Sequence, residues 1–472
     1  MGSTEIYRWL QRIAISTKRK RGEDATLPKA SFVVVAVRAV GAILPAVWRA
    51  RQPNAASHLI LPSSGRETAT RPPTLPNVPN TTTITLSCDV AMCWRVRKSV
   101  QTICGWPTDA FAIDYDDNAV PGQSQGPNLF RREASPHTVL LFIPGNPGCC
   151  SWYQNLLLQA VKRLGRGYAV RAISYAGHGV GANIVGSESG LYNDGRSNAI
   201  VWTIDGQVEH KIQWIDGLLA TDFDGKGRSD LPRFIFVSHS IGAHLVQRLC
   251  VIREDILQRT SLLVHLMPFI RFDPCQAHKK TILSTVAHSP NAAVRFLWTA
   301  SRLASKMPKS MLDKCLKYFA GVDDKEGRQL ALELVCQPRM AQNFLTLGME
   351  EIRDVPERHD DESLRIVGRH CPTAMLFCGG PDHWAPHFHL EELEALRKEG
   401  SLPNNIHTEY KENLVHDFVV HVEMVEPVVD FICSCVVENT GKQAQKQQQL
   451  MGGQSVSSLV DHNLELHLRS KL

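Results

Sequence analysis

The stretch from Phe234 to Leu249 constrains the fold more than any other part of the chain. Four apolar residues, Phe234-Ile235-Phe236-Val237, are typical of a buried strand, and the run from Ala243 to Leu249 predicts a helix. Between them lies Ser238-His239-Ser240-Ile241-Gly242, a variant of the Gly-x-Ser-x-Gly nucleophile elbow. Such a turn brings the strand and helix backbones close together and lifts the central hydroxyl out of the sheet. Ser240 is the candidate nucleophile; a serine that caps the following helix is the alternative.

A second apolar run, Thr138–Ile143, is typical of a strand buried on both faces, and it ends in Pro144-Gly145-Asn146-Pro147-Gly148. In hydrolases with a nucleophile elbow, the loop after this strand and the residue after the nucleophile donate the N–H groups that bind an oxyanion. Those donors would be the backbone N–H groups of Asn146 and Ile241, because Pro147 has none. The alternative is a plain turn that closes the strand.

Two polar residues each come shortly after a further predicted strand. Asp382 follows residues 373–378, and His416 follows residues 406–411. Ser240, Asp382 and His416 occur in the chain order of an α/β-hydrolase triad. In such a triad the histidine takes the proton of the serine, and the aspartate fixes the tautomer of the histidine and stabilises the imidazolium. We therefore expect these three side chains to meet.

Other polar residues offer competing interpretations. Asp273 follows the strand after the elbow helix and is a second candidate for the acid. His383, His387 and His389 suggest a metal site, but they have no set of carboxylate partners. We expect neither a metal nor a cofactor.

The strands and helices alternate over most of residues 91–438, which predicts one α/β-hydrolase domain with a mostly parallel sheet flanked by helices. The alternation stops between about residues 269 and 365, where helical patterns predict a cap insert. Many Lys and Arg residues accompany Phe296, Leu297 and Trp298 in this insert. That combination suits a lid that touches a lipid surface, and a cap merely packed over the core is the alternative.

Both ends of the chain differ from this domain. Residues 1–90 are predicted to be disordered or poorly structured; within them, the apolar segment 32–47 is short for a membrane span and contains Arg38. A helix lying on a surface or an unstructured segment is therefore favoured there over a membrane anchor. Residues 439–472 predict a disordered polar tail. The tail ends in Ser470-Lys471-Leu472, an address that a peroxisomal import receptor reads.

Composition excludes several classes of protein. The chain has 472 residues, of which 43% are hydrophobic and 21% charged, as in an ordinary globular protein. A net charge of +5 is too small and too dispersed to indicate nucleic-acid binding. The 13 cysteines have no paired Cys-x-x-Cys spacing, which favours a reducing compartment over a disulfide framework or a zinc site.

Several short motifs are spread over about residues 100–437. They are F-I-P-G-N-P-G (142–148), A-G-H (176–178), G-Q-V-E-H-K (206–211), S-H-S-I-G (238–242), M-P-F-I (267–270), H-S-P-N (288–291), D-H-W-A-P (382–386) and H-D-F (416–418). On these motifs the chain resembles the lipid droplet-associated hydrolase family. The family usually has glycine at the position of Ser238 and cysteine at the position of Ala385.

The resemblance implies a serine hydrolase that cleaves carboxylic esters of lipids, with sterol esters and acylglycerols as candidate substrates. It places the triad on Ser240, Asp382 and His416, and implies a role in lipid storage or turnover. It also implies a location at lipid droplets and the endoplasmic reticulum through the insert helices, which are less apolar in this chain. The alternatives are a peroxisomal acyl thioesterase on the same fold and a lipid-surface organising protein with little catalytic activity.

Overall fold

The computed structural model describes residues 84–85, 94–116, 138–179, 201–221, 231–272, 290–317, 325–379, 382 and 384–450. The predictions for residues 1–83, for Asp273 and His383, and for Ser470-Lys471-Leu472 lie outside these residues.

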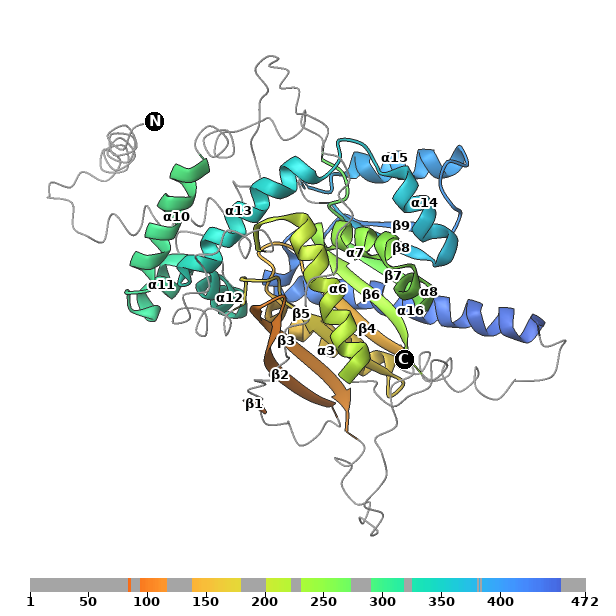
Figure 1. Cartoon of the computed structure of the whole chain (residues 1–472), viewed down its shortest axis with the longest axis horizontal. Coiled ribbons are helices and arrows are strands. Elements are labelled where there is room, and N and C mark those ends of the chain that lie inside the picture. The colour runs from red at the N-terminus through yellow and green to blue at the C-terminus, as the bar shows by residue number, and fades with distance from the viewer. Residues whose placement is uncertain are drawn as a thin grey trace, which may run out of the picture.

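A nine-stranded sheet forms the centre of the molecule (Figure 1), in the order β1-β2-β3-β5-β4-β6-β7-β8-β9. The pairs from β1 to β5 along this order are antiparallel, and all pairs from β5 to β9 are parallel. The parallel strands end at the same edge of the sheet, so the loops that follow them lie together. The strands are β1 (Ile84–Thr85), β2 (Trp94–Ile103), β3 (Trp106–Tyr115), β4 (Thr138–Ile143), β5 (Tyr168–Ile173), β6 (Arg233–His239), β7 (Thr260–Leu266), β8 (Thr373–Cys378) and β9 (Ile406–Lys411).

Helices cover both faces of this sheet. On β4, Leu140 and Phe142 point to one apolar cluster, whereas Val139, Leu141 and Ile143 point to the other, as the alternation of a strand requires. The first cluster includes α3 (Gln154–Leu164), α15 (His387–Lys398) and α16 (Val422–Leu450). The second includes α6 (Ile204–Thr221), α7 (Ile241–Ile252) and α8 (Glu254–Arg259), while α14 (Asp361–His370) contributes to both.

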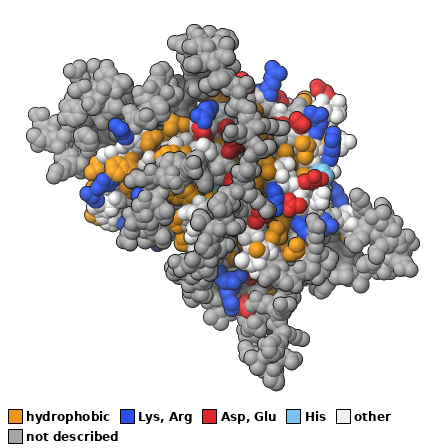
Figure 2. Space-filling model, in the orientation of Figure 1, with side chains coloured by type: hydrophobic (Ala, Val, Ile, Leu, Met, Phe, Trp, Pro, Cys, Tyr) orange, Lys and Arg blue, Asp and Glu red, His pale blue; other side chains and the backbone are white. Residues whose placement is uncertain are grey.

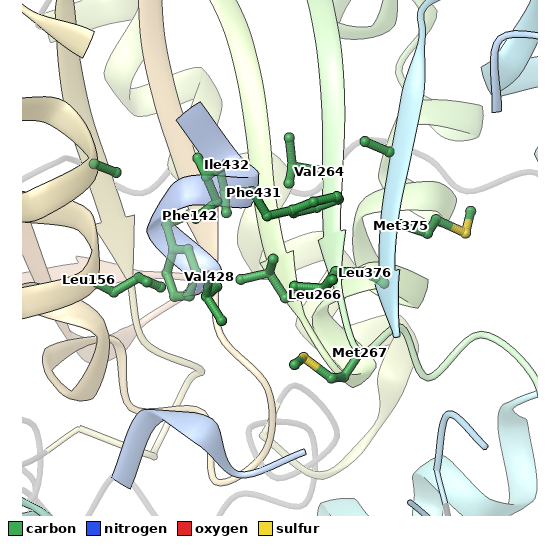
Figure 3. Packing of buried hydrophobic residues seen from close by; sticks show 14 of the residues in the cluster. Phe142, Leu156, Val264, Leu266, Met267, Met375, Leu376, Val428, Phe431 and Ile432 are labelled. Atoms are coloured by element: carbon green, nitrogen blue, oxygen red, sulfur yellow. The ribbon is translucent and has the colours of Figure 1, made fainter. Parts of the chain in front are cut away.

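The first cluster shows why α16 belongs to the domain. Val428, Phe431 and Ile432 of α16 lie beside Phe142 of β4 and Val264 of β7, in the cluster on one face of the sheet (Figure 3). Phe431 is 2% exposed, and truncating a phenylalanine in such a core costs about 3–5 kcal/mol. The last of the described helices is thus part of the main core.

Four further helices form a cap with an apolar cluster of its own. They are α10 (Pro290–Ala304), α11 (Lys309–Cys315), α12 (Lys325–Val335) and α13 (Pro338–Asp354). Figure 1 shows this group beside the sheet, with α13 reaching toward the loops at the ends of the strands. Among the described residues, no helix has the length and apolar character needed to cross a membrane.

Two expectations need correction, and one pair of strands was not predicted. The antiparallel hairpin β2–β3 was not expected, although the alternation in Trp94-Arg95-Val96-Arg97 is typical of a strand. Helix α16 continues to Leu450, beyond the predicted start of the tail at residue 439, because the Gln, Lys and Ala residues there are good helix formers. Leu297 is 3% exposed in the cap cluster, so this side chain faces inward and not toward a lipid surface.

Candidate active site

The turn between β6 and α7 has the geometry of a nucleophile elbow. Ser240 has φ +52° and ψ −126°, a combination that costs a non-glycine residue about 1–3 kcal/mol. Its N–H donates to the carbonyl of Leu266 at 2.9 Å, and its carbonyl accepts from the N–H of Phe269 at 3.1 Å. A Cβ on Gly242 would lie 2.6 Å from the carbonyl oxygen of Ile143, so only glycine fits there.

The alternative role of Ser240 as a helix cap does not hold. Ser240 occupies the N-cap position of α7, but its side chain makes no capping hydrogen bond. Its Oγ instead lies 2.9 Å from Nε2 of His416.

Ser238 occupies the first small position of the elbow without disrupting the turn. It is fully buried in β6, and its Oγ lies 2.7 Å from Nδ1 of His265 on β7. A buried hydroxyl is costly when it has no partner. His265 provides that partner, which explains how serine is accommodated where glycine is usual in the similar family.

The structure brings together the three residues that the sequence places in a triad. Nδ1 of His416 lies 2.7 Å from Oδ2 of Asp382, while its Nε2 faces Ser240. Since a carboxylate only accepts, Nδ1 carries the proton and Nε2 presents its lone pair to the serine hydroxyl. Ser240 follows β6, Asp382 follows β8 and His416 follows β9. All three residues are at most 9% exposed. This arrangement can transfer a proton from Ser240 to His416.

The carboxylate of Asp382 is held by four donors. Oδ1 accepts from the backbone N–H groups of Trp384 at 2.8 Å and Ala385 at 3.0 Å, and Oδ2 accepts from His416 and from the thiol of Cys378 at 3.3 Å. Burial alone would raise the pKa of Asp382, but His416 and the two backbone groups hold it below its ordinary value. Burial and the neighbouring carboxylate raise the pKa of Cys378, so it remains a thiol and donates.

The loop after β4 lies directly against the elbow. A Cβ on Gly145 would be 2.8 Å from Cβ of Ser240, so the chain passes the nucleophile at Gly145 and Asn146. The loop is fixed by the hydroxyl of Tyr175, which donates to the carbonyl of Pro144 at 2.6 Å. On the elbow side, Ile241 is the first residue of α7, where backbone N–H groups have no partner within the helix. The two predicted oxyanion donors, Asn146 and Ile241, thus belong to segments that flank Ser240.

The cap reaches the same loops through α13. The side-chain amide of Asn146 donates to the carbonyl of Phe344 at 3.0 Å, and Asn343 donates to the carbonyl of Gly177 at 2.7 Å. Glu351 is 3% exposed on this helix, and burial raises its pKa well above the ordinary value, although a hydrogen bond from Asn146 opposes this. The cap is therefore anchored to the loop that flanks the nucleophile.

Sequence reasoning missed three residues around the triad. Cys378 is the last residue of β8, and neither its type nor its position indicates contact with Asp382. His239 lies within the elbow motif, and Tyr153 immediately precedes α3, a few residues after the loop that follows β4. The sequence suggested no role for either. Among the residues that the structure describes, no three His, Cys, Asp or Glu side chains are grouped as metal ligands.

A mostly parallel sheet with a serine elbow after a central strand, and with an acid and a histidine after β8 and β9, defines an α/β-hydrolase. The fold predicted from the sequence is confirmed. The family model described as "Lipid-droplet associated hydrolase" matches residues 136–419. The chain belongs to the lipid droplet-associated hydrolase family.

Relatives of that name have low sequence identity to this chain, but the alignments cover most of their length. The lipid droplet-associated hydrolase of Dictyostelium discoideum is 21% identical over 317 residues, covering 65% of this chain and 90% of the relative. The Homo sapiens relative is 22% identical over 303 residues, covering 62% and 84%. Among solved structures, an esterase from Exiguobacterium antarcticum aligns with a TM-score of 0.42 at 11% identity, over 71% of this chain and 97% of that one.

Proposed function

We propose that the protein is a serine hydrolase that cleaves carboxylic esters of lipids through Ser240, His416 and Asp382. The observation that supports this most directly is the unbroken line of hydrogen bonds from Ser240 Oγ through both ring nitrogens of His416 to Asp382. A serine hydroxyl is a weak nucleophile unless an adjacent base takes its proton, and His416 occupies that position.

In the proposed reaction Ser240 attacks the carbonyl carbon of the ester while His416 takes the hydroxyl proton. The backbone N–H groups of Asn146 and Ile241 stabilise the oxyanion, and Asp382 stabilises the imidazolium. His416 then gives the proton to the leaving alcohol, and water hydrolyses the acyl-enzyme by the same steps. The hydrogen bonds that join Ser240 to His416 and His416 to Asp382 support these proton transfers.

The substrate class follows from the family. Its relatives are named for lipid droplets, and droplet cores store neutral lipid esters, so sterol esters and acylglycerols are the proposed substrates. We place the protein at the surface of lipid droplets and at the endoplasmic reticulum, with a role in lipid storage or turnover.

The outer side of the cap offers a means of reaching such a surface. Exposed basic residues lie on and beside α10 and α11, and Leu303 and Met311 of these helices are exposed as well. Figure 2 shows Lys and Arg side chains next to hydrophobic ones on this face of the molecule. Trp298 on α10 is half-buried, with the guanidinium of Arg302 5.1 Å from its ring centroid. Cations around a few apolar side chains favour shallow binding to a phospholipid monolayer with anionic headgroups. The basic residues are Arg295, Arg302, Lys306, Lys309, Lys314 and Lys317.

Replacement of Ser240 by alanine tests the proposal. Ser240→Ala should abolish labelling by a fluorophosphonate probe and reduce ester turnover to the slow rate that binding and the oxyanion donors sustain alone, about 10³–10⁴-fold over water. Its thermal midpoint should not fall, because the side chain is small and the elbow is held by backbone bonds. A panel of sterol esters, acylglycerols and acyl-CoAs should show ester turnover by the wild type.

Other outcomes of this experiment would contradict the proposal. Full activity of Ser240→Ala would refute the serine mechanism. Turnover of acyl-CoA alone would favour a thioesterase, and no turnover of any substrate would favour a surface-organising protein.

A further inference from the structure

Two buried side chains that the proposed mechanism does not use lie directly behind the triad. The hydroxyl of Tyr153 lies 2.8 Å from Nδ1 of His239, and Nε2 of His239 lies 2.9 Å from the backbone carbonyl of His416. Tyr153 is 2% exposed and His239 is 4% exposed, so water does not compete for these bonds. Tyr153 ends the short 3₁₀ helix Cys150–Tyr153 after the oxyanion loop, whereas His239 immediately precedes Ser240.

The partners determine the direction of each hydrogen bond. A carbonyl oxygen only accepts, so Nε2 of His239 carries a proton and donates to His416. Burial, and then the charge of His416, lower the pKa of His239 to about 3, so the ring is neutral and its Nδ1 has only a lone pair. Tyr153 must then donate to His239. The Tyr153 oxygen itself accepts from the backbone N–H of Gly145.

These bonds connect three loops that are distant in the sequence. The connection starts at Gly145 after β4, passes through Tyr153 and His239, and ends on the backbone of His416 after β9. The rings of His239 and His416 also pack with their centroids 5.0 Å apart. His416 thus has a partner on its backbone in addition to the two on its ring.

We propose that Tyr153 and His239 are positioning residues, which fix the backbone of His416 so that its Nε2 stays aligned with Ser240. Neither residue touches the substrate or exchanges a proton with it. The inference rests on the proposed function of His416 as the base. Catalysis is sensitive to such alignment, since a displacement of about 1 Å can reduce the rate about 100-fold.

Two substitutions of His239 distinguish the loss of its hydrogen bond to His416 from the loss of its packing. Gln keeps an N–H near the position of Nε2, whereas Leu fills similar space with no donor. We expect His239→Leu to lower kcat by about 10–100-fold with little change in KM, and His239→Gln to stay within a few-fold of the wild type. Tyr153→Phe, which removes one buried hydroxyl, should resemble His239→Leu. Tyr168→Phe is the matched control, because its hydroxyl bonds Thr440 on the exposed surface of the domain.

The measurements are kcat and KM on a short soluble ester, the rate of fluorophosphonate labelling, and the thermal midpoint. Equal losses in His239→Leu and His239→Gln, or full kcat in Tyr153→Phe, would overturn the inference. If His239→Leu does not fold, Tyr153→Phe decides, since it keeps both rings in place. Labelling of Ser240→Ala would instead overturn the proposed function, so the two failures are distinguishable.

Discussion

The loops at the ends of the parallel strands and the helical cap place their polar groups in opposite ways. In the loops, Ser240, Asp382 and His416 are buried and bonded to partners from other strands. In the cap, the apolar residues form a separate cluster, and the outer side of α10 and α11 carries exposed Lys and Arg side chains. The first arrangement fixes atoms in position, whereas the second leaves charged side chains exposed to solvent.

The two regions meet at the loop after β4. The side chain of Asn146 bonds α13, while its backbone lies beside the elbow. Substitutions in the strand-end loops should therefore change the chemical step, and substitutions on the outer cap should change only surface binding.

The largest effect on kcat is expected for replacement of Asp382, the proposed acid of the triad. Asp382→Asn should reduce kcat about 10⁴-fold, because an amide favours the wrong tautomer of His416 and cannot stabilise the imidazolium. Asp273→Asn is the matched comparison and should retain nearly full activity. Steady-state kinetics on one soluble ester measures both variants, and the reverse ranking would transfer the role of acid to Asp273.

The next effect concerns the cap. Replacing Arg302, Lys306 and Lys309 together by alanine should weaken binding to vesicles with anionic lipid about 100-fold, since each charge near such a surface contributes about 1 kcal/mol. Turnover of a soluble ester should not change. Sedimentation with vesicles that contain or lack phosphatidylserine measures the binding.

A control for that variant is available on another part of the surface. Arg358, Arg369 and Lys398 are also exposed, but they lie on or beside α14 and α15. If their replacement by alanine weakens vesicle binding equally, the cap has no special role in reaching the membrane.

A smaller effect is expected where the cap contacts the loop. Burial raises the pKa of Glu351 in the folded state above its ordinary value of 4.5. As the pH rises past 4.5, the carboxyl group of Glu351 therefore loses its proton in the unfolded chain before it does so in the folded protein. The free energy of unfolding therefore falls with increasing pH. Glu351→Gln stays neutral, so its stability relative to the wild type should increase as the pH rises from 4.5.

Thermal unfolding between pH 4 and pH 9 measures this difference. The exposed Glu362→Gln on α14 is the control and should follow the wild type at every pH. A constant difference between Glu351→Gln and the wild type would mean that Glu351 is ionised in the folded protein.

The smallest effect is expected at Cys378. Its thiol donates to Oδ2 of Asp382, the oxygen that also accepts from His416, so Cys378→Ala should lower kcat. A hydrogen bond worth about 1 kcal/mol limits the loss to less than about tenfold. Cys371→Ala removes an equally buried thiol and should leave kcat unchanged. Steady-state kinetics on the same soluble ester measures both variants, and equal losses in the two would contradict this role.

The sequence by itself determined the parts of the protein that local pattern encodes. The strands β4 (138–143), β8 (373–378) and β9 (406–411) have the predicted bounds, and the apolar run 234–237 lies within β6. The elbow follows from small residues around Ser240, because only they permit the close approach of strand and helix. The triad was predicted from the sequence as well, because Ser240, Asp382 and His416 each follow a recognisable strand.

Tertiary structure alone decided which side chains meet across those strands. Nothing local relates Tyr153 to His239 or Cys378 to Asp382, because these contacts depend on the register and the loop paths of separate elements. Packing likewise decided which face of a helix is buried. Leu297 lies among cationic residues in the sequence, yet it is buried because the other cap helices offer it an apolar surface. Pattern identifies the elements, and the folded arrangement determines the partners of each side chain.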